Sequence, residues 1–269
     1  MELGTGITVL GAALGSKELV VKMLGPTADY LGIGLKNWTE KRIQNVARIF
    51  LIARAKLGET IDNAGAVPPR VLKEILDEGS YCADELTAEY FGGVLASSRS
   101  PNGRDDRGAT YLRLTSELST YQIRFHYLCY SYWRKLFLNS GLRPTFVEDL
   151  KKMAVCWPYS SLLQDMEFSG AEAAMNIILH CTTGLGRLDL LKAEAWGQAG
   201  FLNDYGKQRG WKSVQTDGIV ICPTQFGLDY FLWATGCGQT NYSRFLDREI
   251  RVSEVPNIQL TREPVKLLD

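Results

Sequence analysis

The sequence has little histidine and no excess of charge, and both shortages limit what the protein can do. Only two histidines occur among 269 residues, His126 and His180. The cysteines are widely spaced and form no C-x-x-C pair, so no zinc-ligand pattern can be written. Lys and Arg together number 30, as do Asp and Glu. Bulk charge therefore gives no reason to expect non-specific nucleic-acid binding.

Motifs that carry common enzyme chemistry are also missing. The sequence contains no G-x-x-x-x-G-K-[ST] phosphate loop and no G-x-S-x-G nucleophile elbow. His180 and Cys181 are neighbours, and neighbouring side chains diverge on a helix, so they cannot form a thiol–imidazole pair. The segment 184–186, Gly-Leu-Gly, is better explained as a turn than as part of a phosphate loop. We therefore expect no cofactor, and binding in preference to catalysis.

An even number of cysteines leaves two interpretations open. They could form disulfides, or they could be free buried thiols in a reducing compartment. We expect free thiols, because no secretory signal precedes them. The six residues are Cys82, Cys129, Cys156, Cys181, Cys222 and Cys237.

The densest charge cluster is Arg-Asp-Asp-Arg at residues 104–107. Asp105 and Asp106 are the only metal-ligand candidates, and they are weak ones. The cluster precedes a predicted long helix, where Asp caps free N–H groups and faces the positive end of the helix dipole. Capping and intramolecular ion pairs therefore explain these carboxylates better than a metal site does.

Apolar spacing predicts a mainly helical first half. Apolar residues at steps of three and four predict a helix over 37–58, with Gly58 at its C-cap. A longer helix is predicted over 106–138, because apolar residues repeat every seven positions there. This seam could pack inside one bundle or against another copy. The seam residues are Tyr111, Leu114, Leu118, Tyr121, Phe125, Leu128 and Tyr132.

The second half changes character near residue 211. Helices are predicted over 147–155, 170–181 and 187–196, then strands over 211–216 and 218–222, then a helix over 225–235. Asp217-Gly218 between the two strands is a strong hairpin signal. Helices, a hairpin and a helix follow the order of a winged-helix module. The wing would carry Lys207, Arg209, Trp211 and Lys212, which could contact nucleic acid or a protein partner.

The N-terminal residues 3–16 carry no charge and four glycines. The segment is shorter than the roughly 20 residues that a membrane-spanning helix needs. Gly11-x-x-x-Gly15 allows close backbone approach. The segment could pack on its own bundle, or it could associate with other copies or with a membrane surface. The candidate contact residues are Leu3, Ile7, Val9, Leu10, Gly11, Leu14 and Gly15.

These patterns predict a mainly α fold, with an N-terminal helical bundle followed by a winged-helix-like α+β C-terminal module. The expected organisation is an apolar, Gly-rich N-terminal segment (1–34), the bundle (35–140), the winged-helix-like module (141–255) and an extended tail (256–269).

Several segments resemble the abortive-infection alpha (Abi-alpha) family of bacterial phage-defence proteins. One runs from Pro68-Pro69 to Gly79, and leads through Asp84-Glu85-Leu86 to the segment 90–98, Tyr-Phe-Gly-Gly-Val-Leu-Ala-Ser-Ser. The segments 24–32 and 223–228 fit as well. These are packing motifs, so the resemblance implies antiphage defence but supplies no catalytic residues.

The sequence thus predicts an abortive-infection protein that acts by binding, self-assembly or membrane damage. The alternatives are a nucleic-acid-binding regulator that uses the wing, and a nuclease-like enzyme with an unfamiliar site. We expect a homo-oligomer, with a phage-encoded protein as the trigger and a membrane surface as a further partner. Nucleic acid is the less favoured partner. The expected location is the cytoplasm, or the periphery of the inner membrane.

Overall fold

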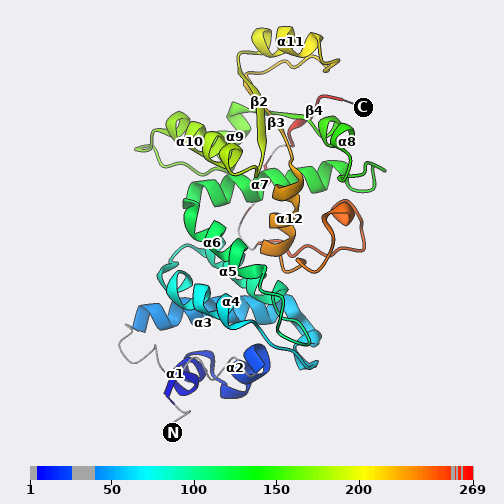
Figure 1. Cartoon of the computed structure of the whole chain (residues 1–269). Coiled ribbons are helices and arrows are strands. Elements are labelled where there is room, and N and C mark those ends of the chain that lie inside the picture. The colour runs from blue at the N-terminus through cyan, green and yellow to red at the C-terminus, as the bar shows by residue number, and fades with distance from the viewer. Residues whose placement is uncertain (1–4, 26–39, 256–257, 259, 262, 269) are drawn as a thin grey trace. The chain divides into compact units, whose positions relative to one another are not determined.

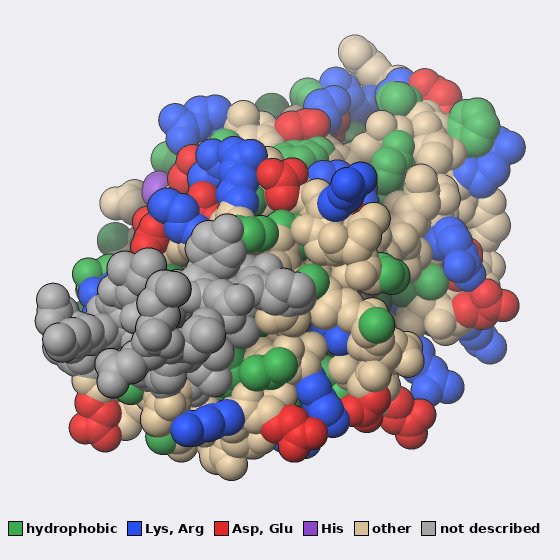
Figure 2. All heavy atoms as spheres, turned by 60° about the horizontal axis from the view of Figure 1, so that its bottom comes forward, with side chains coloured by type: hydrophobic (Ala, Val, Ile, Leu, Met, Phe, Trp, Pro, Cys, Tyr) green, Lys and Arg blue, Asp and Glu red, His purple; other side chains and the backbone are tan. Residues whose placement is uncertain are grey.

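The computed structural model describes residues 5–25, 40–255, 258, 260–261, 263–264 and 265–268. Over these residues the protein is mainly helical and contains a four-stranded antiparallel sheet (Figure 1). The predicted mainly helical class is confirmed. On the face shown in Figure 2, basic and acidic side chains are interspersed, as the equal totals lead one to expect.

The chain divides into two compact units. The first, here called the helical unit, comprises Met1–Leu118, Leu232–Gln239 and Val252–Val255. Its helices are α1 (Thr5–Leu14), α2 (Lys17–Leu24), α3 (Glu40–Leu57), α4 (Pro69–Asp77), α5 (Glu85–Ser97) and α6 (Gly108–Glu117), with short 3-10 helices at Gly58–Asp62 and Gly79–Tyr81.

The second unit, here called the sheet unit, comprises Ser119–Phe231, Thr240–Arg251 and Pro256–Asp269. Helix α12 (Gln225–Ala234) runs across the division between the units. The other elements of the sheet unit are α7 (Thr120–Phe137), α8 (Val147–Lys152), β1 (Val155–Pro158), α9 (Tyr159–Asp165), α10 (Ala174–Arg187), β2 (Lys192–Gly197), α11 (Ala199–Lys207), β3 (Gly218–Cys222), a 3-10 helix at Tyr242–Arg244 and β4 (Val265–Lys266).

The crossing of α3 and α5 organises the helical unit. The predicted α3 is present over Glu40–Leu57, and Gly58 follows it with a φ of 53°. On α5, a Cβ at Gly92 would lie 2.4 Å from Ile52 of α3. A Cβ at the next residue, Gly93, would lie 1.7 Å from the Ala234 carbonyl oxygen. The two glycines of the segment 90–98 therefore allow two different backbones to approach α5.

The sheet has the strand order β2-β3-β1-β4, so β2 is an edge strand. One face packs on α7, where Trp157 of β1 lies 5.6 Å from Phe125 and 5.3 Å from Tyr132 between ring centroids. The other face carries a small core with Leu202 of α11 and Val214. Both faces of the central strands are thus buried.

The predicted single helix over 106–138 is wrong. Leu118 takes an extended conformation, and α6 ends before it. Ser119 then starts α7 with a capping box: its hydroxyl accepts from the Gln122 N–H, while the Gln122 side chain accepts from the Ser119 N–H. All the seam residues except Tyr121 are buried within the chain.

Two predictions around residues 187–216 are also wrong. The predicted helix over 187–196 is instead the end of α10 followed by strand β2. The predicted strand over 211–216 is not formed, although its partner over 218–222 is. The strand beside β3 is β2, and α11 lies between them in the sequence. The hairpin expected of a wing is therefore absent from these residues, and the winged-helix arrangement is not confirmed.

Candidate functional site

A groove runs along the edge of the sheet, between β2 and α10. It has a volume of about 590 Å³ and is hereafter called the edge groove. In Figure 1, α10 lies beside β2, and α11 lies beyond the far ends of β2 and β3. The lining residues include Leu179, Thr182, Thr183 and Gly186 of α10, and Lys192, Ala193, Glu194, Ala195 and Trp196 of β2.

A β-bulge shapes the wall that β2 contributes. Ala193 pairs with Ile221 and Ala195 pairs with Val220, so Glu194 is an extra residue on β2. Because of this extra residue, Ala193 and Trp196 lie on the same face of the sheet although they are three positions apart. A small and a large apolar side chain therefore share the α10 side of the strand.

Apolar side chains remain exposed around the edge groove. Trp196 is 46% exposed and Leu179 is 43% exposed. Isolated exposed apolar residues are common, but a group beside a groove and an edge strand is typical of a contact surface. The strand also carries an ion pair, with 2.5 Å between the Lys192 and Glu194 side chains.

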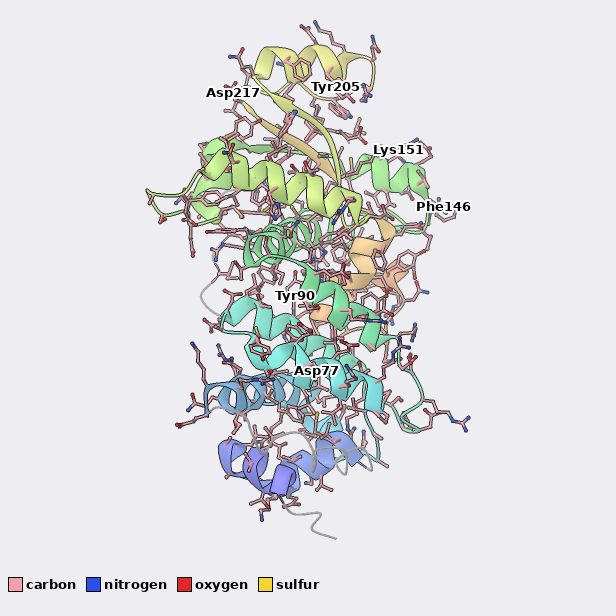
Figure 3. The ribbon with its side chains drawn as sticks, turned by 60° about the vertical axis from the view of Figure 1, so that its left-hand side comes forward. Asp77, Tyr90, Phe146, Lys151, Tyr205 and Asp217 are labelled. Carbon is pink, nitrogen blue, oxygen red and sulfur yellow. The ribbon has the colours of Figure 1, made fainter. Side chains whose placement is uncertain are left out.

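Hydrogen bonds fix the chain at Asp217, just before β3 begins. The Asp217 carboxylate accepts from the Ala199 N–H at 3.0 Å, at the start of α11. The Asp217 carbonyl accepts from the Tyr159 N–H. A Cβ at Gly218 would lie 2.5 Å from the Trp157 carbonyl oxygen, so only glycine fits there. Figure 3 labels Asp217 near the ends of the strands and Tyr205 on α11.

The predicted wing residues lie at the end of α11 and just beyond it. Lys207 pairs with Asp204 at 2.7 Å. The Arg209 guanidinium lies 3.8 Å from the Tyr205 ring centroid and 5.7 Å from that of Trp211. The Lys212 N–H donates to the Leu267 carbonyl. The structure thus brings Arg209 and Trp211 together, although no hairpin carries them.

The predicted N-terminal contact residues are used largely within the chain. Leu10 and Gly11 are buried, and a Cβ at Gly11 would lie 2.7 Å from the Lys17 side chain of α2. Gly15, with a φ of 73°, forms the turn between α1 and α2. Val9 and Leu14 are half-buried. Leu3 lies outside the described residues, and the Ile7 side chain is not described.

The two candidate metal ligands are held by arginines. Asp105 accepts from the Arg107 Nε at 2.9 Å, and Asp106 lies 3.2 Å from Arg70. The hydrogen bond from the Arg107 side chain lowers the pKa of the Asp105 carboxyl. Among the described residues, no group of three or more His, Cys, Asp or Glu side chains could hold a metal ion.

The cysteines are free, as predicted, and most are shielded from reaction. Five are buried, and Cys237 is partly exposed. Burial raises the pKa of Cys82, Cys181 and Cys222 to about 12. These thiols stay protonated at neutral pH, and the thiolate is the nucleophilic form. They are therefore poor candidates for nucleophilic catalysis.

The segments that resemble the Abi-alpha family have packing roles where they are described. The Ser97 hydroxyl donates to the Trp233 carbonyl and accepts from the Gly238 N–H, each at 3.0 Å. Asp84 caps α5 by accepting from the Thr87 N–H. Residues 26–32 of the earlier segment lie outside the described residues.

No family model, curated protein or solved structure matches this chain. The resemblance to the Abi-alpha family therefore stays a prediction. None of the described helices is long and apolar enough to cross a membrane.

Proposed function

We propose that this chain is an antiphage protein of the abortive-infection type that acts by assembling with further copies of itself. The observation that supports the proposal best is the edge strand β2. Among the described residues it has a strand neighbour on one side only, and exposed apolar residues lie beside it. Edge strands are templates for pairing with another chain, and natural proteins commonly cover or charge them.

The charges on β2 favour a second copy as the occupant. In an antiparallel β2–β2 pair centred on Ala193, Lys192 of each copy lies opposite Glu194 of the other. Opposite charges directly across two strands contribute about 0.2–1 kcal/mol per pair. The small Ala193 would face itself at the centre. Such an interface is two-fold symmetric, which is the commonest arrangement of homo-oligomers.

The apolar residues at the edge groove would gain from the same pairing. A strand added beside β2 would cover part of Trp196 and Leu179, which are exposed in the single copy. Burying apolar surface contributes about 25 cal/mol per Å². In this proposal the backbone pairing sets the relative orientation of the two copies, and the apolar contacts set the affinity.

A plaque assay tests the proposed function. We expect cells that carry the gene to yield fewer plaques and to collapse at high phage dose, compared with cells that lack it. Lys192→Glu should abolish this protection, because it places two carboxylates opposite each other. Lys207→Glu is the matched control, since it makes the same charge change on exposed α11 and should keep protection. Full protection by Lys192→Glu at normal protein level would overturn the role of β2.

The runner-up function, a nucleic-acid-binding regulator, loses its predicted hairpin but keeps two of its residues close together. Arg209 and Trp211 share a groove with lysines of α8 and β2.

A further inference from the structure

A second groove lies on the opposite face of β2. It has a volume of about 550 Å³ and is hereafter called the basic groove. Three parts of the sheet unit supply its basic side chains: α8, β2 and the turn after α11. The lining residues are Glu148, Lys151, Lys152, Ala154, Lys192, Glu194, Arg209, Trp211, Cys222 and Leu268. Figure 3 labels Lys151 on α8 and Tyr205 on α11.

The lining of the basic groove is positive although the chain is neutral. It holds four basic side chains and two carboxylates, an excess of two positive charges. Cys222 adds no negative charge, because burial raises the pKa of its thiol to about 12. The other lining residues, Ala154, Trp211 and Leu268, are uncharged. A groove of this kind attracts anions.

The lysines of the groove are held by weak pairs that an anion could replace. Lys151 pairs with Glu148 at 2.7 Å, and Lys152 lies 3.4 Å from Asp149. Both lysines are exposed at the surface. Glu148 is exposed too, so the Lys151–Glu148 pair contributes only about 0–1 kcal/mol, whereas the Asp149 carboxylate of the other pair is buried. A phosphate group can therefore displace Glu148 from Lys151 at little cost.

The aromatic wall adds a second kind of contact. The rings of Tyr205 and Trp211 lie 5.6 Å apart between centroids, and Arg209 lies over both. Trp211 packs closely on Gly206, where a Cβ would lie 3.0 Å from the ring. That packing holds the indole ring in place at the groove. Aromatic and guanidinium planes are the platforms on which nucleic-acid bases stack, each stack contributing about 1–3 kcal/mol.

We propose that the basic groove binds a phosphate-bearing aromatic base, either as a free nucleotide or as a unit of single-stranded nucleic acid. Lys151 and Lys152 contact the phosphate, and Arg209 and Trp211 contact the base. The groove shares Lys192 and Glu194 with the proposed β2 pairing, so its test changes only Lys151, Lys152 and Arg209, which lie outside β2. Duplex DNA is not the ligand, because its bases are stacked inside the helix and cannot reach Trp211.

Fluorescence anisotropy with a labelled 12-nucleotide RNA of mixed sequence tests the proposal on the full chain. We expect binding at low salt, and at least tenfold weaker binding by Lys151→Glu/Lys152→Glu. The slope of log affinity against log salt should fall by about 1.4, since each contact to a single strand contributes about 0.7. Lys73→Glu, at an exposed lysine of α4 in the helical unit, is the control and should bind within threefold of the wild-type protein.

Competition identifies the source of the ligand. Displacement by adenosine monophosphate at equal concentration of nucleotide units assigns the site to free nucleotides, and much weaker displacement assigns it to a strand. Arg209→Ala should weaken either ligand. The proposal is overturned if inorganic phosphate competes as well as the nucleotide, or if duplex DNA competes as well as the single strand. It is also overturned if Lys73→Glu weakens binding as much as the double variant, or if no RNA or nucleotide binds at low salt.

Discussion

The surroundings of His126 determine its role in the protein, and the sequence alone does not reveal these surroundings. It is one of only two histidines in the sequence. In the structure it is fully buried on α7, with its ring 4.5 Å from that of Tyr130 and 4.9 Å from that of Tyr230. Burial lowers the pKa of His126 to about 3, and a hydrogen bond with the Gly227 backbone acts in the opposite direction. His126 is therefore a neutral core residue at neutral pH.

This burial makes stability depend on pH. The unfolded chain protonates His126 below about pH 6.5, whereas the folded chain does so only near pH 3. Between these values the unfolded state binds more protons, so acid favours unfolding. Within this window the unfolding free energy falls by about 1.4 kcal/mol for each unit that the pH is lowered, and this loss is absent above pH 6.5.

We expect His126→Leu to remove this loss. From pH 7 to pH 5, the variant should lose about 2 kcal/mol less unfolding free energy than the wild-type protein. Urea unfolding at pH 7, 6 and 5 measures the difference. His180→Leu changes an exposed residue of α10 and is the control. Its unfolding free energy should change with pH as that of the wild-type protein does. A pH dependence unchanged in His126→Leu would show that the buried imidazole is not its source.

At the scale of elements, the sequence pattern predicted the helices whose formation depends mainly on residues close together in the chain. The apolar spacing of α3 and the glycine after it were read correctly, because the spacing itself produces the buried face. Strand β2 was missed because Ala-Glu-Ala favours a helix, and its strand form depends on pairing with β3, far along the chain. Asp217-Gly218 does not form the predicted hairpin, because residues 211–216 are not a strand. Its contacts are with α11 and with the end of β1.

The same distinction between local and long-range contacts applies to the candidate sites. The sequence located Arg209 and Trp211, whose closeness is local. It could not locate Lys151 and Lys152 beside them, because α8 and the turn after α11 meet only through the fold. The sequence did not predict the edge groove for the same reason. Leu179 and Trp196 belong to two different elements, and β2, which carries Trp196, was predicted as a helix.

The break between α6 and α7 gives an element-scale prediction. The repeat of apolar residues continues through Leu118, so the break depends on the capping box of Ser119 and Gln122. Ser119→Ala should lower the unfolding free energy by about 1 kcal/mol, because it leaves an N–H at the start of α7 without its partner. Ser119→Asp should retain most of that stability. Thermal unfolding of both variants measures this, and equal melting temperatures for the wild-type protein and Ser119→Ala would argue against the cap.

At the scale of the whole molecule, charge is balanced and mixed over the surface shown in Figure 2. Net charge therefore gives no driving force for the proposed assembly, which has to rest on specific local contacts. Strand β2 provides one basic and one acidic side chain at the right spacing for self-pairing, beside exposed apolar residues. Assembly of the chain through this strand is the step on which the proposed defence function depends.

The most direct test of that step is the mass of the purified protein, measured by light scattering after size exclusion. We expect the wild-type chain to run as a dimer or larger, and Lys192→Glu and Glu194→Lys each to run as a monomer. The double variant Lys192→Glu/Glu194→Lys restores opposite charges across the pair, so it should recover the wild-type mass. A monomeric wild-type protein at every concentration, or single variants with the wild-type mass, would contradict assembly through β2.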